Sequence, residues 1–405
     1  MDTTVVVVFG FVYLGMILGK IPGLALDRTG IALLGAISLI ATGEIQPEDA
    51  WRSIDVPTIA LLLGLMVLSA QFRLGGFYAH LTRSLGEMNV SPNLFLAILI
   101  GCAGLLSALL ANDIVCLAMT PVLVEACARR GLDPVPFLLA LACASNVGSA
   151  ATLIGNPQNM LIGQRLHLSF AGYLIDAGVP VLLGLASVWY VINGQARGSW
   201  AKQTSVPTVE ALPFNSWQTG KGVVVLSLLV GLFLVTRLPR DVLALAAAGW
   251  LLSSRRMSSR KMLGLVDWQL LVLFSGLFIV NHVLVTSGNL DSIMTAVRSA
   301  GIDINAPWWL FGVTVLLSNL VSNVPATMLL LPVAVHPMAG PILALASTLA
   351  GNLLIVGSIA NIIVVEQAKG LDVRITWKDH ARVGIPVTLT TLFFAAAWLW
   401  LRAFF

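Results

Sequence analysis

The sequence predicts an all-α polytopic membrane protein made of two inverted repeats of five transmembrane helices, each repeat with a re-entrant hairpin and a broken helix. The first observation behind this fold class is composition. Of the 405 residues, 58% are hydrophobic and only 10% are charged, whereas about 25% are charged in an ordinary soluble domain. The longest polar stretch, near 194–221, is too short to bury a core of its own. The composition therefore excludes a soluble globular, a disordered or a disulfide-scaffold protein.

The second observation is a series of apolar runs that recur from end to end, most of them close to the roughly 20 residues that a spanning helix needs. The first run has Asp2 before it and Lys20 after it, the reverse of a signal peptide, so it is expected to remain as a span. Spans of the first half are expected at about 4–22, 28–43, 55–73, 136–164 and 170–192, with an apolar segment at 93–128 that Asn112-Asp113 interrupts. Spans of the second half are expected at 220–236, 241–254, 267–286, 341–366 and 382–403, with a segment at 306–338 broken at Ser322-Asn323.

The third observation is an internal duplication, because several residues match in order at nearly one offset. The matches are Arg28 with Arg240, Asp55 with Asp267, Gly76 with Gly288, Asn112 with Asn323, Pro121 with Pro332, and GNPQN (155–159) with GSIAN (357–361). They divide the chain into a first repeat at 1–193, a linker at 194–219 and a second repeat at 220–405. Because each repeat crosses the membrane an odd number of times, the two must lie upside-down to one another, as in many secondary transporters.

The distribution of basic residues predicts the orientation. Alternating the spans places most of the 23 Lys and Arg on one side, among them the cluster Arg255, Arg256, Arg260 and Lys261. Positive residues mark the cytoplasmic side. The linker is therefore expected in the cytoplasm and both termini outside, in a bacterial-type inner membrane.

Four segments expected at membrane depth are polar: 111–115, 144–159, 321–327 and 351–361. Unsatisfied backbone groups in lipid cost several kcal/mol, so such breaks are tolerated only where they face protein or water. We expect them to face one another between the repeats and to bind substrate and ion. The candidate residues are Asn112, Asp113, Ser145, Asn146, Thr152, Gly155, Asn156, Asn159, Ser322, Asn323, Thr327, Gly357, Ser358 and Asn361. Asparagines between helices can also be structural glue.

Asp113 is the candidate coupling residue, since it has no Lys or Arg within ten residues and a carboxylate at membrane depth is a functional hypothesis by default. A proton or a Na⁺ ion could neutralise it. We therefore expect H⁺ or Na⁺ as coupling ion, with Na⁺ at the hairpin tips as one option and no other metal or cofactor. The alternative is that 93–128 forms two full spans joined by a solvated loop. Glu125 and Asp176 fall near span ends, where hydration is expected.

At these motifs the chain resembles the ion transporter superfamily, which includes arsenite/antimonite efflux permeases, citrate-type permeases and divalent anion/sodium symporters. Ala111-Asn112-Asp113 with Thr120-Pro121 is similar to the AND…TP stretch of the arsenite-permease branch, whereas the divalent-anion branch has Ser-Asn-Thr there. The segment 322–325 resembles the SNVP of the second hairpin, and GSIAN resembles the GSLAN of the arsenite/citrate branch. GNPQN resembles the GTPPN loop of carboxylate symporters and is most similar to that of small, poorly characterised inner-membrane permeases.

The resemblance covers nearly the whole chain. It implies inverted repeats with re-entrant hairpins and a substrate site between the hairpin tips and the broken helices. Homodimers and elevator-like movements are common among such relatives.

Together these features predict a secondary active transporter for a small anion or an oxyacid, coupled to H⁺ or Na⁺, and neither an enzyme nor a nucleic-acid-binding protein. GxxxxGK[ST] is absent, which excludes ATP-driven pumping by this chain alone, and HExxH and GxSxG are absent too. One alternative is an arsenite/antimonite efflux permease that exchanges its substrate for protons. Another is an anion channel.

Overall fold

The structure is a computed structural model that describes residues 2–403 apart from 20–22, 24, 197, 199 and 203–211. Lys20 and the middle of the expected linker lie outside the described residues. Helices make up nearly all of the described chain, and one isolated β-bridge joins Leu132 to Ala201. The prediction of an all-helical, multi-span protein is confirmed.

The first half contains ten helices among its described residues. They are α1 (Thr3–Leu18), α2 (Arg28–Ala41), α3 (Pro47–Ser53), α4 (Val56–Leu74), α5 (Phe77–Glu87), α6 (Pro92–Leu109), α7 (Asn112–Arg129), α8 (Pro134–Ser149), α9 (Pro157–Arg165) and α10 (Phe170–Ala196). Local sequence sets several of their beginnings. Asp27, Asp55 and Ser91 each accept a hydrogen bond from a backbone N–H of the first turn, and α3, α4, α6, α8 and α9 have proline within that turn. Both features favour a helix start.

The second half follows the same order. Its helices are α11 (Ser216–Val235), α12 (Arg240–Leu252), α13 (Ser259–Leu263), α14 (Trp268–Thr286), α15 (Asn289–Ser299), α16 (Pro307–Val321), α17 (Asn323–Leu330), α18 (Ala339–Ala350), α19 (Ile359–Lys369) and α20 (Trp377–Arg402). Short 3₁₀ turns follow α17 at Leu331–Val333 and precede α19 at Ile355–Gly357. Asp267 caps α14, and Thr376 and Asp379 form a capping box at α20.

Six of these helices are long and apolar enough to cross a membrane: α4, α6, α10, α11, α14 and α20. The helices α1, α2, α8, α16 and α18, and α17 together with its 3₁₀ turn, are apolar but shorter. Every expected span coincides with one helix or with a pair interrupted by a break. The helices α3, α5, α13 and α15 were not predicted, because each is too short or too polar to register as an apolar run.

Four helices, α2, α4, α12 and α14, form a group that we call the frame. Within it α4 packs closely against α12, and α2 against α14. Glycine makes both contacts possible: a Cβ on Gly64 would lie 2.6 Å from the Ala244 carbonyl carbon, and one on Gly276 would lie 2.8 Å from the Ala32 carbonyl carbon. Small residues let helix backbones approach in this way.

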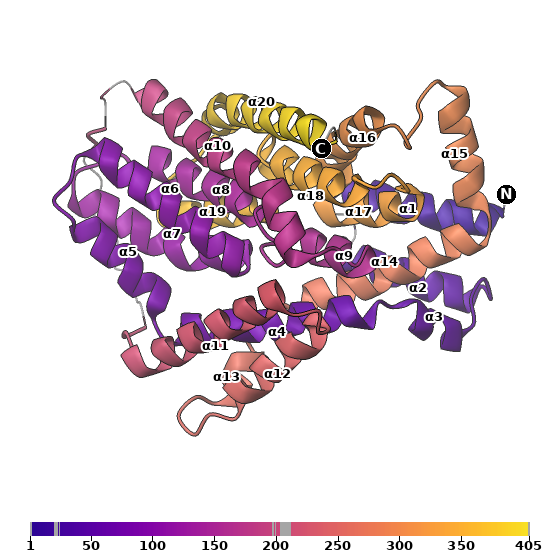
Figure 1. Ribbon diagram of the computed structural model, residues 1–405, viewed down its shortest axis with the longest axis horizontal. Coiled ribbons are helices and arrows are strands. Elements are labelled where there is room, and N and C mark those ends of the chain that lie inside the picture. The colour runs from indigo at the N-terminus through magenta and orange to yellow at the C-terminus, as the bar shows by residue number, and fades with distance from the viewer. Residues whose placement is uncertain are drawn as a thin grey trace.

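The helices α6 to α10 and α16 to α20 form a second group that we call the bundle. Close packing joins α6 to α8, α10 to α20, and α16 to α18. Figure 1 shows α2, α4 and α12 in the lower part of the molecule and most bundle helices in the upper part. The four polar breaks all lie in the bundle.

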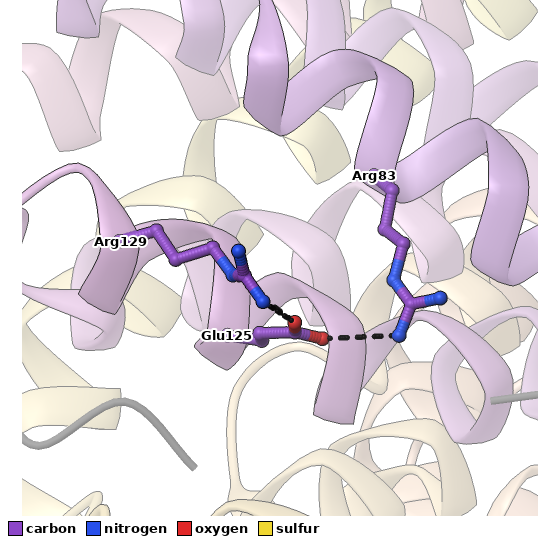
Figure 2. A network of polar contacts seen from close by, with 3 residues as sticks. All are labelled: Arg83, Glu125 and Arg129. Atoms are coloured by element: carbon purple, nitrogen blue, oxygen red, sulfur yellow. Dashed lines mark hydrogen bonds and ion pairs between the residues drawn. The ribbon is translucent and has the colours of Figure 1, made fainter. Parts of the chain in front are cut away.

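Two acidic residues near span ends are ion-paired rather than simply hydrated. Glu125 of α7 is 6% exposed and accepts hydrogen bonds from Arg129 at 2.8 Å and from Arg83 of α5 at 3.4 Å (Figure 2). Asp176 of α10 pairs with Arg402 of α20 at 3.0 Å. The expectation of hydration was therefore wrong for Glu125, because an arginine from a helix that was not predicted covers it.

Candidate functional site

Each hairpin breaks at a short non-helical tip. The first break lies at Leu110–Ala111 and α7 begins at Asn112, so the break falls just before the expected Asn112-Asp113. The second break lies at Ser322, whose φ of 76° is unusual for a residue other than glycine. Such a conformation costs of the order of 1–3 kcal/mol, and it persists where the surrounding structure enforces it. The second tip is therefore a strained turn.

The broken helices unwind beside these tips. The chain is non-helical between Ser149 and Pro157 in the first half and largely so between Ala350 and Ile359 in the second. Both segments are mostly buried, so their backbone groups need partners within the protein. Asparagine, serine and threonine side chains supply many of them.

Asn146 is the centre of the polar network. Its amide nitrogen donates to Asn352 Oδ1 at 2.8 Å and to Asn361 Oδ1 at 3.0 Å. Its amide oxygen accepts hydrogen bonds from Ser358 Oγ at 2.8 Å and from Asn112 Nδ2 at 3.4 Å. One side chain of the first half thus joins the first tip to both sides of the second unwound segment.

The first tip is held by α8 and by the unwound segment. Ser145 Oγ lies 2.8 Å from Ser107 Oγ and donates to the Asn112 carbonyl oxygen at 3.2 Å. The backbone N–H of Asn112 donates to the Gly155 carbonyl oxygen at 3.4 Å. Gly155 has no room for a side chain, since a Cβ would lie 2.2 Å from the Ser149 carbonyl oxygen.

The GNPQN segment binds the second half through Thr348. Asn156 Nδ2 donates to Thr348 Oγ1 at 3.2 Å, and Gln158 Nε2 donates to the same atom at 3.1 Å. Thr348 Oγ1 in turn donates to Asn159 Oδ1 at 3.4 Å, while Asn156 Oδ1 caps α9 by accepting from the Asn159 N–H. The hydroxyl of Thr152 donates to the Ala108 carbonyl oxygen in the first hairpin. These hydrogen bonds join the first unwound segment to α18 on one side and to the first hairpin on the other.

Both tips carry buried polar oxygens with no partner in the described part of the chain. At the first tip this holds for Asn112 Oδ1, and at the second for Asn319 Oδ1, Asn323 Oδ1 and Thr327 Oγ1. Asn319 Oδ1 and the Gly351 carbonyl oxygen both lie near Gly357, at 3.1 and 3.2 Å from where its Cβ would be. Neutral oxygens of this kind are ligands for a hard cation or acceptors for a substrate hydroxyl.

Asp113 lies in the first turn of α7 and is partly exposed. Within the described residues its carboxylate has no hydrogen bond and no ion pair, and Asp267 of α14 lies within electrostatic range. It is therefore a carboxylate that no fixed cation neutralises. Among the described residues no three His, Cys, Asp or Glu side chains gather to hold a metal ion.

The candidate residues thus divide into two parts. Asn112, Ser145, Asn146, Gly155, Ser358 and Asn361 meet around the first tip, and Thr152, Asn156 and Asn159 extend this cluster toward Thr348. Asn323, Thr327 and Gly357 lie at the second tip, where Ser322 makes the turn. Four residues were not among the candidates: Asn319 at the second tip, and Thr348, Asn352 and Tyr173 of the network, where Tyr173 Oη accepts a hydrogen bond from Asn159 Nδ2 at 3.2 Å. Asn352 stands in a predicted break, whereas Thr348 and Tyr173 lie outside the four polar segments, in mostly apolar runs.

A comparison with known families decides the identity. The family model described as citrate transporter matches residues 13–350. The chain belongs to the citrate transporter family. The resemblance to the ion transporter superfamily is thereby confirmed, and this family member is a transporter, not an enzyme.

Two relatives of this citrate transporter family member extend over almost the whole chain. The inner membrane protein YbiR of Escherichia coli is 30% identical over 368 residues, covering 89% of this chain and 91% of YbiR. The silicon efflux transporter LSI3 of rice, Oryza sativa subsp. japonica, is 29% identical over 463 residues, covering 95% and 94%. The crystal structure of the YdaH transporter of Alcanivorax borkumensis superposes with a TM-score of 0.60 at 15% identity, covering 98% of both chains. This last likeness concerns the fold alone and supports a multi-pass transporter architecture.

Proposed function

We propose that the protein is a secondary active transporter that moves a small anion or an oxyacid, coupled to H⁺ or Na⁺, by alternating access. The observation that carries the proposal is the network around Asn146, which ties both unwound segments and the first tip together at one place. It offers buried donors and acceptors, and in the described structure no Lys or Arg side chain hydrogen-bonds to it. Such a site suits a substrate that is bound by hydrogen bonds and helix ends rather than by a fixed positive charge.

Two inverted repeats, at 1–193 and 220–405 with a linker at 194–219, account for matching details in the two halves. Gly76 and Gly288 both have positive φ, at 69° and 71°, and precede α5 and α15. The C-terminal turns of α9 and α19 also match. Leu168 N–H donates to the Gly163 carbonyl and Val373 N–H to the Ala368 carbonyl, each across a residue with positive φ, His167 and Asp372.

The position of the tips supports re-entrant hairpins. Asn112 bonds to the middle of the interrupted α8–α9 pair, and Asn323 lies beside Gly351 in the α18–α19 break. If each interrupted pair crosses the membrane, then both tips stop near half depth. This supports the hairpins at 93–128 and 306–338 as re-entrant rather than fully spanning.

Two substrate classes fit the site. An anion would be bound by the N-termini of α7, α9, α17 and α19, whose free N–H groups carry partial positive charge. A neutral oxyacid, such as arsenite or antimonite, needs no cation and would exchange for a proton on Asp113. The lack of a Lys or Arg hydrogen-bonded to the described network fits both classes, and the name of the rice relative, a silicon efflux transporter, favours the second.

The decisive experiment is transport by the purified protein in liposomes, with electrogenic current and internal pH recorded. The panel contains dicarboxylates, citrate, phosphate, sulfate, arsenite and antimonite, each with and without a Na⁺ gradient. A saturating flux that moves a second ion against its gradient supports the transporter. A flux that does not saturate and is not coupled to H⁺ or Na⁺ would indicate an anion channel instead.

Replacement of Asn323 by alanine is expected to raise the apparent KM, or the Na⁺ concentration for half-maximal transport, at least about tenfold, since one lost interaction of 1.4 kcal/mol has that effect. The buried oxygen of Asn323 has no partner among the described residues, so it is available to a ligand. Transport kinetics in liposomes measure the change, with Asn305→Ala, in the loop before α16, as a matched control. Unchanged kinetics would assign the second tip to the scaffold.

A cysteine in place of Arg255 is expected to react with a membrane-impermeant maleimide only from the cytoplasm. Arg255 is exposed and lies in the basic cluster that follows α12. Trp308, 72% exposed at the start of α16, provides the opposite control when replaced by cysteine. Labelling of position 255 in intact cells would overturn the orientation with both termini outside.

A further inference from the structure

We propose that two matching latches, one at each end of the frame, hold the bundle alternately, and that the structure has one latch closed and the other open. The closed latch consists of Arg240 and Asp55 on the frame and the C-terminal end of α9. The open latch consists of Arg28 and Asp267 on the frame and the C-terminal end of α19. This proposal rests on the inverted repeats of the proposed function.

In the closed latch, Arg240 caps the C-terminal end of α9. One of its terminal nitrogens donates to the Gly163 carbonyl at 2.8 Å and to the Leu168 carbonyl at 2.9 Å. Beside it, Arg165, the last residue of α9, forms an ion pair with Asp55 at 2.6 Å. Asp55 is the N-cap of α4, and Arg240 is the first residue of α12. Charged hydrogen bonds to the free carbonyls of a helix end are stabilising, so frame and bundle are held together at this end.

The open latch has the same parts without their partners. Arg28 is the first residue of α2, as Arg240 is of α12, and its buried Nε has no hydrogen bond in the described structure. Asp267 caps α14, as Asp55 caps α4, and forms no ion pair with any described residue. Lys369, the last residue of α19, stands one position before the counterpart of Arg165, which is Gly370. Its side chain is exposed and lacks an ion pair within the described structure.

The end of α19 presents the acceptors that Arg28 lacks. In α9 the two carbonyls bound by Arg240 belong to Gly163 and Leu168, the residues joined by the last backbone hydrogen bond of that end. The equivalent bond in α19 joins Ala368 and Val373. Arg28 would therefore bind the Ala368 and Val373 carbonyls, and Lys369 would pair with Asp267.

The packing of helices shows the same asymmetry. The bundle helix α9 packs against α4 of the frame, and α17 packs against α14. The equivalent pairs, α19 with α14 and α7 with α4, have no packing of that extent. One end of the bundle is therefore seated on the frame and the other end is not.

The two latches exclude each other because the bundle is internally tied. Hydrogen bonds link the two halves through Asn146 and Thr348, so α9 and α19 move together. Seating α19 on Arg28 and Asp267 then requires the release of α9 from Arg240 and Asp55. The balance between the latches sets the ratio of the two conformations.

The test is chemical cross-linking in a background in which the four native cysteines are replaced. Cysteines at 55 and 165 report the closed latch, and cysteines at 267 and 369 report the second latch, each pair joined by a short bifunctional thiosulfonate. We expect both pairs to cross-link in membranes, each in a fraction of molecules. A pair at 267 and 369 that never cross-links, while the pair at 55 and 165 does, would overturn the proposal.

Single charge removals should shift this ratio in opposite directions. Arg240→Gln should raise cross-linking at 267 and 369 about tenfold or more relative to 55 and 165, and Arg28→Gln should lower it by a similar factor. Arg237→Gln, an exposed arginine in the same loop as Arg240 without a partner in the described structure, is the matched control and should change nothing. If Arg237→Gln and Arg240→Gln change the cross-linking ratio equally, the change reflects general surface charge, and the latch proposal is wrong.

This readout does not depend on the substrate. If cross-linking follows the expected pattern but the protein transports nothing in the panel, the latch proposal is supported and the proposed transport activity is wrong. Coupled transport with no cross-link at 267 and 369 would keep the transporter and remove the latches.

Discussion

An Asp113→Asn variant is expected to fold normally and to lose coupled transport altogether. The Asp113 carboxylate has no hydrogen bond or ion pair within the described structure, so the substitution removes neither kind of interaction there. Asparagine has nearly the same shape but can neither take up a proton nor balance the charge of Na⁺. The variant should therefore match the wild type in thermal stability while substrate-driven changes in internal pH disappear.

The measurement is paired transport and internal pH in liposomes, with Asp291→Asn on the exposed start of α15 as the matched control. A signal with arsenite or antimonite that the Asp113 variant loses would assign metalloid/proton exchange. A signal with a charged anion alone would direct attention to the helix N-termini. Normal proton-coupled turnover by the variant would end the proposed role of Asp113.

An Asn146→Ala variant is expected to lose both transport and stability. Asn146 makes four side-chain hydrogen bonds, and its removal leaves buried polar atoms of Asn352, Asn361 and Ser358 with fewer partners. Each buried group left without a partner costs about 1–3 kcal/mol. We therefore expect the free energy of unfolding to fall by roughly 3–5 kcal/mol, within the range of the largest single-residue effects.

Thermal unfolding in detergent and transport in liposomes measure the two effects. Gln158→Ala, which removes one hydrogen bond to Thr348, is the matched control and should cost about 1 kcal/mol. Equal stabilities of the two variants would show that Asn146 is not the centre of the network. A stable Asn146 variant that still transports would separate the network from the substrate site.

Much of the fold could be predicted because the membrane imposes simple rules on the sequence. Apolar runs marked the spanning helices, and Asn112, Ser322 and GNPQN marked the breaks, since polar and helix-breaking residues are costly at membrane depth. The helices α5 and α15 were missed because their charged and apolar residues are mixed. Of the two partners of Glu125, Arg83 could not be predicted for the same reason, because it lies on α5.

The candidate site was predicted less completely. Residues in polar clusters, such as Asn146 and Asn361, were found because their neighbours are polar too. Thr348 and Tyr173 were missed because they lie outside the polar segments, and one or two hydroxyl groups in an apolar run have many uses. The difference between Arg240 and Arg28 could not be predicted at all: the two residues match in the alignment of the halves, and only three-dimensional structure distinguishes their surroundings.

Two of the chain connections between frame and bundle, at Gly75-Gly76 and at Gly288, differ in how closely the surrounding structure packs on them. The connection at Gly75-Gly76 packs closely against the segment before α11. A Cβ on Gly76 would lie 2.6 Å from the Pro213 carbonyl oxygen, and the Asn215 N–H donates to the Gly75 carbonyl. The next helix, α5, is clamped to α7 through Glu125, whereas α15 packs mainly on the end of α14 and stands apart in Figure 1. Apart from its neighbours in the chain, no described atom lies within 4 Å of a Cβ built on Gly288. Of these two connections, we therefore expect the one at Gly288 to bend more readily when the bundle is displaced relative to the frame.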